Sequence, residues 1–261
     1  MKEIITSAQN ERIKEIIRLR KPRERRKQDL IIIEGWQEIE LAKQADLEIT
    51  EVFYCQDFAN AGKITSLAEE IITPVSTLVF QKISYRENPD GFLALAKPKY
   101  LELEKIKLSS NPLIIILESL EKPGNLGAIL RSADAAGVDV VIVADSKTDI
   151  YNPNVIRASL GMVFTNQVAV SGVEEIKKWL KDKKIKSFAA TPEAEKLYTE
   201  VNYIGPTAFI MGEEHPGLSK DWLDAAKEKI RIPMAGKINS LNVSVSTAII
   251  LFEAIRQRNK K

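Results

Sequence analysis

The chain has 261 residues, a formal net charge of +2, 44% hydrophobic residues and 28% charged residues. This balance is typical of a globular protein of two ordinary domains, and it excludes a disordered or fibrous chain. The apolar runs are too short to span a bilayer and the N-terminus carries no apolar signal region, so we expect a cytoplasmic protein without membrane contact. The single cysteine, Cys55, and the single histidine, His215, exclude a disulfide and a zinc site of Cys and His ligands, and we expect no metal.

Residues 1–97 are predicted to form a small α/β domain. Its first helix is amphipathic, with Ile13, Ile16 and Ile17 on one face, and is expected to end at Pro22. The expected strands cover residues 30–34, 49–54, 75–80 and 92–96, and the expected helices cover residues 36–45 and 64–71. Residues 98–112 have proline close to both ends and no apolar period, which predicts a linker.

Residues 113–261 are predicted to form a second α/β domain, in which apolar strands alternate with helices. The expected strands cover residues 113–118, 138–145, 187–191, 207–212 and 229–233, and the expected helices cover residues 122–137, 173–181 and 241–258. The strands are almost continuously apolar, which predicts a parallel sheet covered on both faces and joined by right-handed crossovers.

A local basic segment runs from Glu11 to Asp29, where nine Lys and Arg residues accompany four Asp and Glu residues. Two interpretations stay open: a solvated amphipathic helix followed by a charged turn, or a surface that binds phosphate groups. Under the second interpretation the candidate RNA contacts are Arg18, Arg20, Lys21, Arg23, Arg25, Arg26 and Lys27.

Ligands of open parallel sheets bind at the carboxyl ends of the strands, so the loops that follow the strands are the expected place for a site. The loop after residue 118 is glycine-rich and contains Asn125, and Arg131 follows one to two helical turns later. Its Gly-x-x-Gly spacing lacks the glycine doublet of a dinucleotide-binding turn. On spacing alone, Arg131 would simply pair with a surface acid.

Two further loops carry more polar groups than a turn requires. Residues 211–219 contain Gly212 and Glu214 among two glycines, a proline and two acids. In residues 232–246, either Ser240 or Asn242 would serve as an ordinary helix N-cap, but five Asn and Ser residues are present. This surplus indicates a polar pocket rich in backbone groups.

Together the three loops resemble the motifs of the SpoU/TrmH family of RNA ribose 2′-O-methyltransferases in the SPOUT superfamily. The first motif is PGNLGAILRSADAAG, the second is FIMGEEHPGLS and the third is IPMAGKINSLNVSVSTAI. Upstream, TSAQNERIKEIIRL and KPRERRKQDLIIIEGWQEIELA are similar to the substrate-binding N-terminal domain of many members, a ribosomal-protein-like fold that binds RNA. The resemblance therefore covers nearly the whole chain.

The resemblance implies a deep trefoil knot in the catalytic domain, with S-adenosylmethionine bound in it largely through backbone groups. Carried over by position, the cofactor contacts are Gly212, Ile232, Met234 and Leu241. Family members are homodimers, so the resemblance also implies that Arg131 of one protomer completes the site of the other.

Methyl transfer to a ribose hydroxyl requires in-line alignment and removal of one proton. Because a guanidinium stays protonated in proteins, we expect Arg131 to hold a phosphate and stabilise the developing alkoxide instead of acting as the base. The residues expected to orient Arg131 and the ribose are Asn125, Glu214, Ser240 and Asn242. The family commonly has a small residue where His215 stands. The segment 151–161 resembles a family helix near the site, and this resemblance makes Arg157 a further candidate for phosphate binding.

The leading hypothesis is methylation of a ribose in structured RNA, with ribosomal RNA favoured as substrate. Transfer RNA is the alternative substrate, and a catalytically silent RNA-binding or assembly factor of the same fold is the alternative class. An oxidoreductase would instead bind NAD, and calorimetry with both ligands would separate the two.

Overall fold

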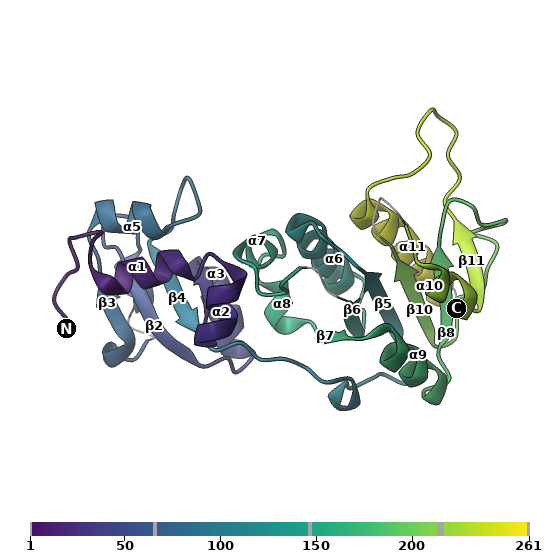
Figure 1. Cartoon of the computed structure of the whole chain (residues 1–261), viewed down its shortest axis with the longest axis horizontal. Helices are drawn as coiled ribbons and strands as arrows, with labels where there is room; N and C mark the ends of the chain where they lie inside the picture. The colour runs from purple at the N-terminus through teal and green to yellow at the C-terminus, as the bar shows by residue number, and fades with distance from the viewer. Residues whose placement is uncertain (1, 65–66, 146–147, 213–216, 260–261) are drawn as a thin grey trace. The chain divides into compact units, whose positions relative to one another are not determined.

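The computed structural model describes residues 2–64, 67–145, 148–212 and 217–259 and divides into two compact α/β units (Figure 1). Unit 1 comprises Met1–Lys99 together with Tyr151–Thr165, and unit 2 comprises Tyr100–Ile150 together with Asn166–Lys261. The predicted α/β fold class is therefore confirmed.

Unit 1 is built on a mixed sheet of four strands in the order β1-β4-β2-β3. The strands are β1 (Ile31–Glu34), β2 (Ile49–Tyr54), β3 (Ile72–Pro74) and β4 (Phe92–Ala96), and β4 runs antiparallel to both of its neighbours. The helices are α1 (Glu11–Arg18), α2 (Pro22–Gln28), α3 (Trp36–Gln44), α4 (Ala61–Ile64), α5 (Thr77–Ile83), α7 (Pro153–Ala158) and α8 (Met162–Thr165), with a 3-10 turn at Glu69–Ile71. Ile13 and Ile16 of α1 and Phe80 of α5 are fully buried in one core cluster with Phe53 of β2.

Three predictions for this unit are wrong in detail. Residues 75–80 were expected to form a strand because they are rich in β-branched and aromatic residues, but Thr77–Ile83 is helical. Burial there follows the helical period, since Val79, Phe80 and Ile83 are buried and Leu78 is 77% exposed. Pro22 does not end the first helix but occupies the first turn of α2, where its missing N–H costs no hydrogen bond. The helix expected at 64–71 is replaced by α4 and the 3-10 turn, with residues 65–66 outside the described part of the chain.

Unit 2 is built on seven strands in the order β7-β6-β5-β10-β8-β11-β9, and every pair of neighbours is parallel. The strands are β5 (Leu113–Glu118), β6 (Val140–Ala144), β7 (Val168–Ser171), β8 (Lys186–Ala190), β9 (Lys196–Leu197), β10 (Thr207–Met211) and β11 (Glu228–Arg231). The helices are α6 (Pro123–Ala135), α9 (Val173–Asp182), α10 (Lys220–Ala225) and α11 (Val243–Arg258), with a 3-10 turn at Leu103–Lys105. The predicted parallel sheet is confirmed, while β7, β9 and α10 were not predicted because such short elements show no hydrophobic period.

Helices cover both faces of this sheet. Trp179 of α9 and Trp222 of α10 share a core cluster with Ile114 and Ile116 of β5. Side chains alternate along a strand, so Ile115 faces the opposite side, and it is fully buried as well. Helices α6 and α11 pack against each other (Figure 1). The threading of the chain into a trefoil knot stays a prediction.

The C-terminal helix is fastened to the loop before β10 by polar contacts. Gln257 accepts a hydrogen bond from the backbone N–H of Tyr203 at 2.9 Å, and Arg258 donates to the Tyr203 carbonyl at 3.0 Å. The Tyr203 hydroxyl donates to the carbonyl of Tyr198 at 2.7 Å, and burial raises the pKa of this tyrosine above its ordinary value of 10.0. Helix α11 is thereby held in place at its C-terminal end.

Among the described residues, no helix combines the length and the apolar composition that crossing a bilayer requires.

Candidate functional site

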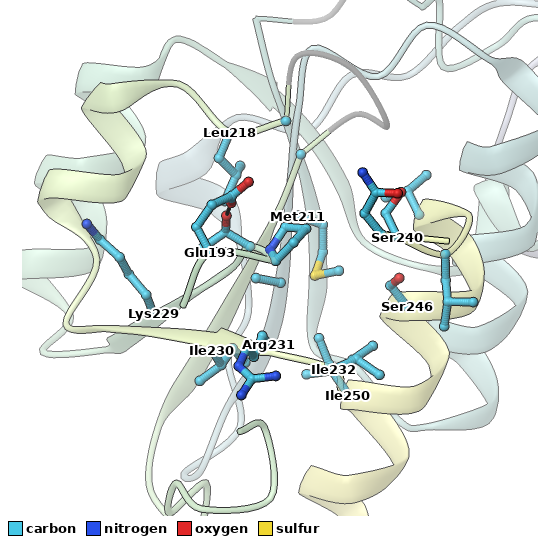
Figure 2. Close-up of a pocket in the computed structure, with 18 of the residues that line it drawn as sticks. Glu193, Met211, Leu218, Lys229, Ile230, Arg231, Ile232, Ser240, Ser246 and Ile250 are labelled. Atoms are coloured by element: carbon cyan, nitrogen blue, oxygen red, sulfur yellow. Dashed lines mark hydrogen bonds between the residues drawn. The ribbon is translucent and has the colours of Figure 1, made fainter. Parts of the chain in front are cut away.

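A cavity of about 530 Å³ lies at the carboxyl ends of β8, β10 and β11, and we call it the cofactor cavity (Figure 2). This is the edge at which parallel sheets bind ligands, and the volume is that of a small-molecule site. The apolar part of its lining includes Met211, Leu218, Ile230, Ile232, Met234, Leu241 and Ile250. All four predicted cofactor residues, Gly212, Ile232, Met234 and Leu241, line it, together with Ser240.

Gly212 is required by the close approach of two backbone segments at the end of β10. A Cβ atom at this position would lie 2.7 Å from the Gly217 carbonyl carbon and 2.7 Å from the Leu218 nitrogen. Because both atoms belong to the backbone, they cannot rotate away. A residue without a side chain therefore lets the loop after β10 close against its own strand.

The loop between β11 and α11 leaves its backbone groups available to a ligand. Within the described part of the chain, residues 233–241 make no backbone hydrogen bond with the backbone of other residues. Asn242 ends this stretch as the N-cap of α11, and its side-chain oxygen accepts from the Ser244 N–H at 2.9 Å and from the Ser244 hydroxyl at 2.6 Å. The polar surplus is thus divided: Asn242 and Ser244 form the cap, whereas Asn239, Ser240 and Ser246 line the cavity.

The first and third motifs meet at one side-chain pair. The Asn242 amide nitrogen donates to the Asn125 side-chain oxygen over 3.1 Å. Asn125 lies in the first turn of α6, and Asn242 follows Leu241 of the cavity wall. Two predicted site residues that are far apart in the sequence are therefore in contact.

Glu118, at the end of β5, is a positioning residue that the sequence analysis missed. Its carboxylate is 7% exposed and accepts the backbone N–H of Ser219 at 2.7 Å. This charge-assisted bond fastens the loop after β10 to the neighbouring strand. A lone acid at a strand end gives no sequence signal of such a role.

Three charged residues at the cavity were also not predicted. Glu193 follows β8, and Lys229 and Arg231 lie on β11 (Figure 2). The Thr191 hydroxyl donates to the Glu193 carboxylate and holds the pKa of that group below its ordinary value of 4.5. The cavity therefore presents charges of both signs beside an apolar wall.

These features fit S-adenosylmethionine, which combines a flat apolar base, a ribose and a charged amino-acid end. Met211, Ile232 and Leu241 would hold the base, and the backbone of residues 233–241 offers polar groups that no described backbone group occupies. Glu193 and Arg231 are of opposite charge, as are the ammonium and carboxylate of the cofactor.

Comparison with known families decides the classification. Residues 112–252, more than half of the chain, match the SpoU rRNA Methylase family. The chain belongs to that family. Residues 10–94 of this SpoU methylase match the MRM3-like substrate binding domain, so the resemblance stated from the sequence is confirmed in both halves.

Individual relatives extend the likeness over the whole chain. A crystal structure of an RNA 2′-O ribose methyltransferase is 44% identical, covers 98% of this chain and 99% of its own, and superposes with a TM-score of 0.87. An AdoMet-bound rRNA methyltransferase from Sinorhizobium meliloti is 27% identical, with 97% of each chain covered and a TM-score of 0.87. A 23S rRNA (guanosine-2′-O-)-methyltransferase of Pectobacterium atrosepticum is 38% identical over 174 residues, or 64% of this chain and 71% of that one.

Among the predicted catalytic residues that the structure describes, Ser240 lines the cofactor cavity, whereas Asn125, Arg131 and Asn242 are not among its lining residues. Arg131 is exposed on α6 and makes no ion pair or hydrogen bond with its side chain among the described residues. Glu214 lies outside the described residues, as does His215. The described lining of the cofactor cavity in this SpoU methylase therefore contains no Arg131.

The predicted RNA contacts of α1 and α2 separate into two groups. The side chains of Arg18, Lys21, Arg23, Arg26 and Lys27 are exposed, and we call this set the basic surface. Arg25 does not fit the prediction, because it is 2% exposed and donates to the carbonyls of Leu19 and Arg20 at 2.9 Å each. The Arg20 side chain also donates hydrogen bonds within unit 1.

Arg20 is half-buried and caps the end of α5. Its guanidinium donates to the carbonyls of Lys82, Ile83 and Ser84 at 3.0 to 3.1 Å and lies 4.7 Å from the centre of the Tyr85 ring. Arg157, the remaining candidate, is exposed on α7 of unit 1.

Proposed function

We propose that this chain transfers the methyl group of S-adenosylmethionine to a ribose 2′-hydroxyl of ribosomal RNA. One observation carries the proposal: all four predicted cofactor residues line a single cavity at the ends of parallel strands. The relatives named as RNA 2′-O ribose and 23S rRNA methyltransferases, the first of which matches 98% of the chain, support the choice of reaction and substrate.

The chain's own contribution is to align the reactants and exclude water. The cofactor supplies an electrophilic methyl group on its sulfonium. The apolar wall around Met211 and Leu241 shields that group from solvent, and Ser240 with the Asn125–Asn242 pair orients the ribose at the cavity edge. None of these steps requires a histidine.

The active unit in this proposal is a homodimer in which Arg131 acts across the interface. Arg131 does not line the cofactor cavity of its own chain, so the site lacks the predicted guanidinium until another protomer supplies it. Helix α11, which packs on α6, exposes Val245 to 47% and Phe252 to 49%. Because exposed apolar side chains are stabilised by burial, these two residues favour contact of this helix with another protomer.

Hybrid dimers test this arrangement. At a cofactor concentration far below the Kd of Gly212→Ala, neither Arg131→Ala nor Gly212→Ala should show appreciable activity alone, but an equal mixture should recover about one quarter of the wild-type activity, because half of the dimers hold one complete site. Analytical ultracentrifugation of the same samples checks that they are dimers. A mixture as inactive as its components would show that Arg131 acts within its own chain.

We assign RNA contact to residues 1–97, methyl transfer to residues 113–261 and a linker role to residues 98–112. The basic surface supports the first assignment, because exposed Arg and Lys side chains attract phosphates in a salt-dependent manner. A variant in which Arg23, Arg26 and Lys27 are changed to Ala should bind RNA more weakly and bind the cofactor normally. The matched control changes three exposed lysines at the end of α9, namely Lys181, Lys183 and Lys184.

Mapping 2′-O-methyl groups in RNA from cells with and without the gene tests the function itself. A position in ribosomal RNA that loses its methyl group without the gene supports the proposal. A lost position in transfer RNA would instead establish the alternative substrate, and an unchanged map would favour an RNA-binding factor without catalysis.

A further inference from the structure

A second hollow of about 550 Å³ lies within unit 1, apart from the cofactor cavity, and we call it the unit 1 pocket. It is bounded by the start of α3, the loop before β4 and the α7–α8 segment. The residues that matter for its chemistry are Trp36, Lys63, Arg86, Asp90, Arg157 and Leu160. It shares no lining residue with the cofactor cavity.

Arg86 is fixed in this pocket by buried groups. Its Nη2 atom donates to the Glu34 carbonyl at 3.0 Å and pairs with the carboxylate of Glu38, a residue 3% exposed. The guanidinium lies against bare backbone, because a Cβ on Gly35, where φ is +106°, would be 2.7 Å from Nη1. The Nη1 edge has no partner among the described residues, so a preorganised donor remains available.

Arg157 reaches the same pocket from a segment that is tightly seated on α3. At Gly161, where φ is +82°, a Cβ would lie 2.8 Å from Leu41 Cδ1 and 3.3 Å from Glu38 Cα. This contact fixes the turn that follows α7. The Arg157 side chain itself is exposed and makes no ion pair or hydrogen bond within the described part of the chain.

Two of the three acids that line the pocket are already engaged by other groups. Glu38 is paired with Arg86, and Asp90 accepts the backbone N–H of Trp36 at 2.7 Å and that of Phe92 at 3.3 Å. Glu40, the third acid, is exposed, so the groups left for a ligand are two guanidinium edges, one carboxylate and an apolar surface. Leu160, which is 41% exposed, forms part of that surface.

We propose that the unit 1 pocket binds one unstacked nucleotide of the RNA substrate, with the phosphate on Arg86 and Arg157 and the base against Leu160. Guanidinium forks match phosphate oxygens, and single-stranded RNA is recognised through splayed bases on apolar or planar side chains. The inference rests on the proposed function in that RNA is taken as the ligand. It adds a substrate contact contributed by a segment, Tyr151–Thr165, that the SpoU family match places in the methylase half.

The test measures RNA binding without methyl transfer. A fluorescein-labelled single-stranded RNA of 12 nucleotides is titrated with the full chain in the absence of cofactor, and fluorescence anisotropy is followed at several salt concentrations. Arg157→Ala should weaken binding about tenfold and reduce the slope of log K against log salt by about 0.7. Lys183→Ala, which removes an exposed cation of unit 2 without a side-chain partner among the described residues, should change neither quantity.

A photo-crosslink locates the nucleotide directly. RNA carrying 4-thiouridine should crosslink to peptides that contain Trp36 or residues 157–160, and Arg157→Ala should lose this product. Unchanged affinity in Arg157→Ala, with crosslinks confined to α1 and α2, would overturn the pocket while leaving methyl transfer intact. A chain that binds RNA through Arg157 but methylates no ribose would refute only the proposed function.

Discussion

Replacing Gly212 by alanine tests whether the cofactor cavity depends on backbone contact at the end of β10. The added Cβ would lie 2.7 Å from two backbone atoms, where ordinary contact begins at 3.4 Å, so the loop must move by roughly 0.7 Å. Overpacking of this size costs about 1–3 kcal/mol of unfolding free energy. Because the displaced residues Gly217 and Leu218 line the cavity, cofactor affinity should fall as well, by about fivefold to 150-fold if the same energy is lost on binding.

Urea unfolding and isothermal titration with S-adenosylmethionine measure the two effects on Gly212→Ala. The matched control is Gly205→Ala in the same unit, where a Cβ would meet no atom within 4 Å and φ is not positive. The control should keep its unfolding free energy within about 0.5 kcal/mol. If Gly212→Ala unfolded at the wild-type urea concentration and bound the cofactor with the wild-type Kd, the reasoning from close approach would be wrong.

Three further variants probe the surrounding contacts. Glu118→Ala should lower the unfolding free energy by about 1.5–3 kcal/mol, because it leaves the Ser219 N–H without its carboxylate partner. Urea unfolding measures this loss, with Glu118→Gln as a second variant, and two variants as stable as the wild type would contradict the prediction. A double-mutant cycle of Asn125→Ala and Asn242→Ala should give a coupling of about 0.5–1 kcal/mol, with Asn242→Ala the more destabilising because it also removes a helix cap, and a coupling of zero would show that the pair does not interact. Burial raises the folded-state pKa of Tyr203, so its contribution to stability is complete below its unfolded pKa of about 10 and is lost as pH rises above that value. Urea midpoints from pH 9 to 11.5 should therefore fall less steeply in Tyr203→Phe than in the wild type, and equal slopes would refute the assignment.

The cofactor residues were predicted from the family resemblance, whereas strand order predicted only that the loops after apolar strands meet at one edge of a parallel sheet. Gly212, Ile232 and Leu241 lie in or beside such loops and line one cavity. The contact between Asn125 and Asn242 was not predictable from spacing, since it depends on how α11 packs against α6. A pairing of that kind is decided by tertiary packing.

The count of charged residues did not predict which arginines are exposed and which form hydrogen bonds within the unit. Arg20 and Arg25 contribute to the basic character of residues 11–29, yet both donate to backbone carbonyls inside unit 1. The sequence contains no sign of this, because an arginine that caps a helix end and one that faces solvent have the same neighbours in the chain. Segment 75–80 failed for a related reason: its β-branched residues favour a strand, but burial of Val79, Phe80 and Ile83 favours a helix.

The division of the chain has a consequence for dissecting this enzyme. Because Tyr151–Thr165 belongs to unit 1, the polypeptide passes between the units three times, and cutting the linker at residues 98–112 would not yield two self-sufficient pieces. A fragment beginning at residue 113 would lose the contacts of α7 with β1 and of α8 with α3, which would expose apolar residues that are buried in unit 1, and it should aggregate. Exchanging substrate-recognition modules between relatives would therefore succeed only if the inserted segment travels with the N-terminal module.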